Sequence, residues 1–167
     1  MTFKEYADFL LPNISHDINY YEEKYPSRNL NDNAQVTRFA PSPTGFVHFG
    51  SLFTAFVASK VAKQTNGVFY LRIEDTDQKR TVLNGVNGII KDLKDYGISI
   101  DEGMTSENTE IGDYGPYIQS MRKEIYQTYA HYLIENNLAY PSFQTAEELE
   151  KIKEEQELNK DRIGYYG

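Results

Sequence analysis

The sequence predicts an α/β fold built around a βαβ unit that forms a nucleotide site. Two short apolar stretches, 36–39 and 68–73, have the length and composition of strands. Between them lies an apolar, Ala-rich run, 52–62, which is predicted to be a helix. The order strand, helix, strand is the order that a βαβ unit requires.

A rigid turn separates the first strand from this helix. Pro41 and Pro43 fix φ and prevent the strand from continuing, and residues 44–45 turn the chain. Residues 48–51 then open the helix. A helix N-terminus offers unpaired N–H groups and the positive end of the helix dipole, so this position suits a phosphate group.

The second strand ends in a carboxylate cluster, Glu74-Asp75-Thr76-Asp77. In open α/β sheets, ligands bind outside the carboxyl ends of the strands. Each feature has an ordinary explanation by itself, since His48 could be a surface histidine and the carboxylates could cap the next helix. Their occurrence together, within about forty residues and in βαβ order, favours a site.

Composition limits the class of protein. The 167 residues suffice for one domain with a real core, and 40% hydrophobic residues argue against disorder. The chain has no cysteine, which excludes disulfides and thiolate metal sites. Because no secretory leader or membrane span is recognisable, a cytoplasmic protein is expected. The net charge of −8 does not favour a nucleic-acid partner, which would need a local basic face or further parts of the protein.

Two motifs resemble a known family. Residues 38–51 read RFAPSPTGFVHFGS and residues 69–80 read FYLRIEDTDQKR. Both closely resemble the start of the catalytic domain of bacterial-type glutamyl-tRNA synthetases, which are class I aminoacyl-tRNA synthetases. The HFGS at 48–51 stands where the class signature HIGH would stand, and Ser51 replaces the second His, as is common in glutamate enzymes.

The resemblance implies a two-step acyl transfer. Glutamate attacks the α-phosphate of ATP, and the glutamyl-adenylate is then passed to tRNA(Glu). It assigns glutamate contacts to Arg38, Ala40, Ser42 and Glu74. It assigns ATP contacts to His48, Gly50 and Ser51, with His48 and Gly50 as the catalytic residues.

The resemblance also implies which cofactors to expect. Mg²⁺ would travel with ATP rather than occupy a protein cage. Some relatives bind zinc through cysteines near residues 140–143, where this chain reads YPSF, so no zinc is expected. Asp75 and Asp77 are expected to be structural.

Three parts are expected in the chain. They are the first half of a Rossmann-like catalytic domain at 36–113, part of an inserted α/β domain that binds the tRNA acceptor end at 114–167, and, before them, a helical N-terminal extension at 1–35 that the pattern of residues predicts and that is not part of the family core. The second half of the nucleotide fold, the KMSKS loop and the anticodon-binding domain would lie outside this chain. A fragment of a longer protein, with an unpaired sheet edge, is therefore expected.

Periodicity predicts the remaining elements. Helices are expected from Phe3 to an end at Pro12, at 14–24, 82–96 and 118–136, and from the Thr145–Glu148 capping box to about Lys160. Strands are expected at 98–100 and 139–143. His16 and His131 are expected to be surface residues.

Four alternatives stay open at this point. A nucleotidylyltransferase outside translation can also place a His-x-Gly-His turn after its first strand. A paralogue that glutamylates a queuosine base of tRNA lacks the anticodon domain. Glutaminyl enzymes share the turn but usually carry Glu-Pro in place of Ser42-Pro43. Finally, the chain by itself could be a nucleotide-binding module without catalysis.

Overall fold

The computed structural model describes residues 2–45, 47–77 and 79–165. The chain divides into two compact units. One consists of residues 13–129, and the other combines residues 1–12 with 130–167. Residues 13–35, at the end of the N-terminal extension, therefore cluster with the sheet.

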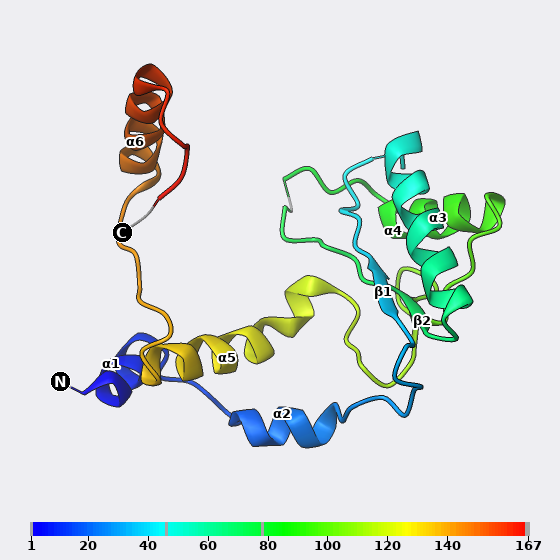
Figure 1. Ribbon diagram of the computed structural model, residues 1–167, viewed down its shortest axis with the longest axis horizontal. Helices are drawn as coiled ribbons and strands as arrows, with labels where there is room; N and C mark the ends of the chain where they lie inside the picture. Colours follow the sequence, from blue (N-terminus) through cyan, green and yellow to red (C-terminus); the bar gives the residue numbers. More distant parts are fainter. Residues whose placement is uncertain (1, 46, 78, 166–167) are drawn as a thin grey trace. The chain divides into compact units, whose positions relative to one another are not determined.

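The 13–129 unit contains a mixed sheet, of which Figure 1 labels β1 and β2 near α3 and α4. Its strands are β1 (Val36–Phe39), β2 (Val68–Leu71), β3 (Glu102–Met104) and β4 (Glu110–Ile111), in the order β1-β2-β3-β4. The pairs β1–β2 and β2–β3 are parallel, and β4 runs antiparallel to β3. Among the described residues, β1 is an edge strand, and the carboxyl ends of β1 and β2 meet at one side of the sheet.

Helices α3 (Phe49–Gln64) and α4 (Gly85–Asp95) are the crossovers of this sheet. Their buried residues join strand residues in one core, which includes Phe39, Leu52, Ala55, Phe69, Leu71, Ile89 and Leu93. The predicted strand–helix–strand unit is thus confirmed. Helix α4 begins three residues later than predicted because Asn84 has a left-handed backbone, and it is followed by Gly97, which has φ +67°.

The predicted strand at 98–100 is wrong, because pairing begins at Glu102 instead. The N–H of Ile98 donates to the Leu93 carbonyl, so this residue still closes the end of α4. The Asp101 carboxylate then accepts the N–H of Phe69 at 2.8 Å. The side chain of Asp101 thus takes the position at which a ladder hydrogen bond would otherwise form.

The extension contains α1 (Phe3–Leu10) and α2 (Ile18–Lys24). Helix α1 begins as predicted but ends at Leu10, before the predicted end at Pro12. Helix α2 starts later than predicted because the Asp17 side chain accepts the N–H of Tyr20 and caps the helix. His16 is half-buried and stacks on Tyr20 with the ring centroids 3.7 Å apart, so its prediction as a surface residue is wrong.

The C-terminal part contains a 3₁₀ turn (Gln119–Arg122), α5 (Lys123–Glu135) and α6 (Ala146–Asn159). The predicted strand at 139–143 is wrong. Tyr140 and Phe143 are largely exposed and have no core to pack on, and Pro141 has no N–H to donate to a ladder. His131 is also not a surface residue, because its side chain is 13% exposed and hydrogen-bonds to Asp8 at 2.8 Å.

Candidate nucleotide and amino-acid site

A cavity of about 580 Å³ lies where β1 turns into α3. It is lined by Phe39, Ala40, Pro41, Ser42, Thr44, Gly45, Val47, His48 and Ser51. Four of the residues predicted for substrate binding are therefore brought together: Ala40, Ser42, His48 and Ser51. The size of the cavity is in the range of ordinary small-molecule sites.

The N-terminus of α3 forms one side of this cavity. His48 occupies the N-cap position, and its carbonyl accepts the N–H groups of Ser51 and Leu52 at 3.0 and 3.1 Å. The first N–H groups of the helix have no intrahelical acceptor by geometry. A phosphate in the cavity could therefore accept them while the helix dipole favours its charge.

The imidazole of His48 is held beside this helix end. Its Nδ1 lies 3.3 Å from the Oγ of Ser51, so the ring and the hydroxyl form a hydrogen bond in which the tautomer of the ring decides the donor. The side chain of His48 is exposed. The N–H at its other ring nitrogen can therefore donate a hydrogen bond to a ligand oxygen.

Gly50, which is also predicted to contact ATP, lies in the first turn of α3. A Cβ at Gly50 would meet no atom within 4 Å. Gly50 is not among the residues that line the cavity. The structure thus leaves room beside Gly50 for a ligand without requiring glycine for the protein's own packing.

Glu74 and Arg38 form a second group at the strand ends, next to the cavity. An Nη of Arg38 lies 3.7 Å from Oε1 of Glu74. The N–H of Glu74 donates to the carbonyl of Pro41 at 2.9 Å, which links the end of β2 to the turn that lines the cavity. Neither charged side chain lines the cavity itself.

Arg72 is a member of this group that the sequence reasoning missed. Its Nη2 lies 3.0 Å from Oε1 of Glu74, closer than the guanidinium of Arg38. Its Nε is buried and has no hydrogen-bond partner in the described part of the chain. The sequence did contain a signal for this pairing. Residues i and i+2 of an extended segment share one face, which places Arg72 beside Glu74.

The other two carboxylates of the acidic cluster have partners within the protein. Asp75 accepts the N–H of Ser120 at 2.9 Å and its hydroxyl at 2.5 Å, which anchors the start of the 3₁₀ turn. Asp77 pairs with Arg80 at 2.5 Å. Both carboxylates thus have partners within the protein that fix the local chain conformation.

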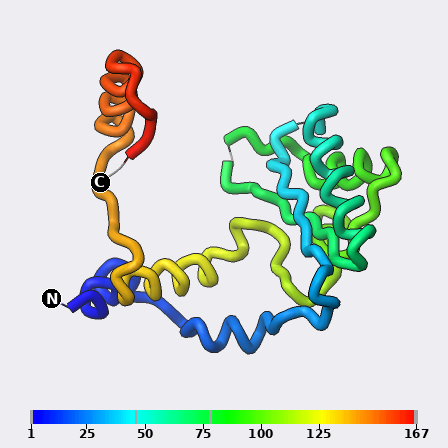
Figure 2. The backbone as a smooth tube through the Cα atoms, in the orientation of Figure 1, coloured from blue at the N-terminus to red at the C-terminus, as the bar shows by residue number. Residues whose placement is uncertain are grey.

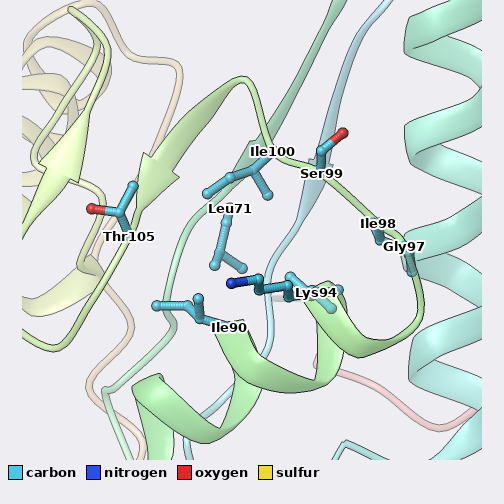
Figure 3. Close-up of a pocket in the computed structure, with 9 residues that line it drawn as sticks. Leu71, Ile90, Lys94, Gly97, Ile98, Ser99, Ile100 and Thr105 are labelled. Carbon is cyan, nitrogen blue, oxygen red and sulfur yellow. The ribbon is translucent and has the colours of Figure 1, made fainter.

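A second cavity, of about 390 Å³, lies beside α4 (Figure 3). Its labelled side chains are mostly aliphatic, with Leu71, Ile90 and Ile100 around it and Lys94 as the charged group. It contains none of the residues predicted for substrate binding. Its apolar lining does not offer the several polar contacts that a nucleotide requires.

Among the described residues, no group of three or more His, Asp or Glu side chains is arranged to hold a metal ion. Within the same residues, no helix has both the length and the apolarity needed to cross a membrane.

Comparisons with known proteins agree with the geometry. The family described as tRNA synthetases class I (E and Q), catalytic domain, matches residues 35–165. The glutamate–tRNA ligase of Clostridium beijerinckii is 51% identical over 167 residues, which is 100% of this chain and 30% of that relative. The glutamate–tRNA ligase of Acetivibrio thermocellus is 51% identical over 168 residues, 100% of this chain and 31% of the relative.

A solved structure is also similar. The crystal structure of a glutamate tRNA ligase from Elizabethkingia meningosepticum, in complex with its amino acid, is 40% identical with a TM-score of 0.64. The match covers 80% of this chain and 26% of that one. The chain thus spans about 30% of the length of the curated relatives that it matches.

These matches confirm the predicted fold class and explain the two motifs. The family match begins at residue 35, whereas the two bacterial relatives align along all of this chain and so share its N-terminal extension. The chain therefore belongs to the class I tRNA synthetases for glutamate and glutamine, within their catalytic domain.

Proposed function

We propose that the protein attaches glutamate to tRNA(Glu) in an ATP-dependent reaction, through a glutamyl-adenylate, and that this chain contributes the ATP and glutamate sites. The observation that carries the proposal is the cavity at the N-terminus of α3, which is lined by Ala40, Ser42, His48 and Ser51. Relatives named glutamate–tRNA ligase support the choice of amino acid. Mg²⁺ would arrive with ATP.

In the first step, the α-carboxylate of glutamate attacks the α-phosphate of ATP and pyrophosphate leaves. In the second, a hydroxyl of the terminal tRNA ribose attacks the carbonyl carbon of the adenylate and AMP leaves. Neither step needs a covalent bond to the protein, so the protein accelerates the reaction by positioning the substrates and stabilising charge. His48 would donate to a phosphate oxygen, and the open space at Gly50 would let the phosphates approach the helix end.

Glutamate would bind between the cavity and the ends of β1 and β2. Arg38 is 42% exposed, and its planar fork suits a carboxylate. Glu74 would accept the ammonium group, together with Ser42. Arg72 would hold the Glu74 carboxylate in place, because it is the nearer of its two arginine partners.

Within this proposal, residues 36–113 are the first half of the nucleotide fold and residues 114–167 are part of the inserted domain for the tRNA acceptor end. Residues 1–35 are the extension. The anticodon-binding parts and the KMSKS loop would lie in the remaining length that the relatives have.

The test is charging of tRNA by the full-length protein that carries this chain. The wild-type protein is expected to charge tRNA(Glu) with glutamate and not with glutamine. His48→Ala should lower kcat by about 10²-fold, the usual cost of losing one donor to a developing charge, while KM for glutamate changes little. His16→Ala removes a histidine that stacks on Tyr20, away from the cavity, and serves as the matched control.

Two results would contradict the proposal. A protein that attaches glutamine to tRNA, or that transfers glutamate to a tRNA base instead of the terminal ribose, has a different function. Equal kcat values for the His48 and His16 variants would mean that the cavity at α3 is not the reaction site.

A further inference from the structure

Residues 25–28, in the N-terminal extension, are bound to the segment 102–117 by two sets of contacts. Arg28 forms a two-point ion pair with Glu102, with Nη2 at 2.5 Å from Oε2 and Nε at 3.3 Å from Oε1. Both side chains are largely buried, at 19% and 15% exposed. The guanidinium also lies over the ring of Tyr114, 3.6 Å from its centroid.

The second set of contacts runs in both directions. The hydroxyl of Tyr25 donates to the carbonyl of Gly115 at 2.6 Å, and the hydroxyl of Tyr114 donates to the carbonyl of Pro26 at 2.7 Å. Figure 2 shows the two segments side by side, after α2 and before the 3₁₀ turn. Residues 25–28 lie outside the family match, which begins at residue 35.

Glu102 connects this attachment to the sheet. Its Oε2, which pairs with Arg28, also accepts the hydroxyl of Tyr117 at 2.7 Å. Tyr117 is 2% exposed. Its burial, and then its hydrogen bond to Glu102, raise the pKa of Tyr117 far above the usual range, so it remains a donor to Glu102.

The backbone of Tyr117 in turn holds the residue before Glu74. The N–H of Ile73 donates to the carbonyl of Tyr117 at 2.9 Å, and the N–H of Gln119 donates to the carbonyl of Ile73 at 2.9 Å. These bonds make a parallel bridge between Ile73 and Ile118. Because the N–H and the carbonyl of Ile73 are both hydrogen-bonded to residues 117–119, the direction in which Glu74 leaves the strand is fixed as well.

We propose that Arg28 is a positioning residue for glutamate binding: through Glu102 and Tyr117 it fixes the backbone bridge that orients Glu74. The inference rests on the proposed function, in which Glu74 contacts the ammonium group of glutamate. Arg28 does not line the cavity at the N-terminus of α3. Its effect is expected on glutamate rather than ATP, because the chain of contacts ends at Glu74, after β2, whereas His48 is the N-cap of α3.

The first experiment compares Arg28→Gln with Lys91→Gln in the full-length protein. Lys91 forms an exposed ion pair with Asp95 on α4, so its variant removes the same charge from a pair outside this chain of contacts. Arg28→Gln should raise KM for glutamate by about tenfold and leave KM for ATP nearly unchanged, since small displacements of a binding group cost this much or more. Arg28→Lys, which keeps the charge but loses the fork, should lie between.

A double-mutant cycle tests the route. Glu102→Gln keeps an oxygen that can accept the hydroxyl of Tyr117 but loses the charge that pairs with Arg28. If the two residues act along one route, the double variant should have the same KM for glutamate as Arg28→Gln alone. Thermal unfolding of each variant establishes that it is folded at the assay temperature.

The outcomes separate this inference from the proposed function. A wild-type protein that does not charge tRNA with glutamate would overturn both the proposed function and this inference. If the wild type is active, the inference alone is overturned by an unchanged KM for glutamate in Arg28→Gln, by equal rises for glutamate and ATP, or by additive effects in the cycle. A lowered melting temperature with wild-type KM values would mean that Arg28 only stabilises the fold.

Discussion

Gly103 lies in β3 with φ +121°, a conformation that side chains rarely adopt. A Cβ at this position would lie 2.2 Å from the carbonyl oxygen of Leu71 on the neighbouring strand. Glycine is therefore required for β2 and β3 to pair. Nothing in the sequence reveals the positive φ of Gly103, because this conformation arises from the close approach of two strands that are distant in the chain.

We predict that Gly103→Ala lowers the free energy of unfolding by at least about 2 kcal/mol, because it adds backbone strain and a steric clash. Gly88→Ala is the matched control. Gly88 lies inside α4, and a Cβ there would meet no atom within 4 Å. This substitution should stabilise the protein by about 0.5–1 kcal/mol. Urea unfolding measures both, and equal effects would contradict the assignment.

The charged residues of the site show what residue-level reasoning can and cannot supply. The motifs predict that Arg38 and Glu74 belong together, and the structure places them 3.7 Å apart. The pairing of Arg72 with Glu74 follows from strand periodicity and was predictable in principle. The link from Glu102 to Arg28 was not, because 74 residues separate them and no local pattern connects them.

At the scale of the elements, patterns succeed where local interactions decide the structure. The capping box at Thr145 and Glu148 was predictable because both of its hydrogen bonds lie within one turn. The strands predicted at 98–100 and 139–143 failed because a strand needs a partner, and pairing is not a local property. The Ile98–Ile100 alternation reflects burial beside α4 instead of a ladder.

The capping box also gives a prediction for α6. The N–H of Thr145, and then its hydroxyl, lower the pKa of Glu148 by hydrogen bonding to its carboxylate. A group with a lowered folded-state pKa stabilises the fold above its unfolded pKa, and the contribution is lost as pH falls through the folded value. The helical circular dichroism of α6 should therefore decrease below about pH 4.

Glu148→Gln separates this effect from the titration of other carboxylates. Glutamine keeps a neutral acceptor for the cap, so this variant should lose less helical signal between pH 7 and pH 3 than the wild type does. Glu155→Gln, an exposed residue later in the same helix, should respond as the wild type does. Identical acid profiles for all three proteins would mean that the cap does not control this transition.

At the scale of the molecule, one unit holds every part of the candidate site. Residues 13–129 include the cavity, the N-terminus of α3, the charged group at the strand ends and the contacts from the extension. Residues 13–35 of the predicted extension cluster with the sheet in this unit. The contacts of Tyr25 and Arg28 account for this, and side-chain contacts of such long range leave no periodic trace in a sequence.

We propose that the turn after β1 and the ends of β1 and β2 form one site for glutamyl-adenylate. Isothermal titration with a non-hydrolysable glutamyl-adenylate analogue measures binding at this site. The full-length protein that carries this chain is compared with an Arg38→Ala, Glu74→Ala double variant. A Lys91→Ala, Asp95→Ala variant, which removes an exposed ion pair on α4, is the matched control.

We predict that the wild-type and control proteins bind the analogue equally. The Arg38, Glu74 variant should bind at least about 100-fold more weakly, since it loses two charged contacts to the ligand. Equal affinity for all three proteins, each shown to be folded by circular dichroism, would contradict the account and place the glutamate site elsewhere.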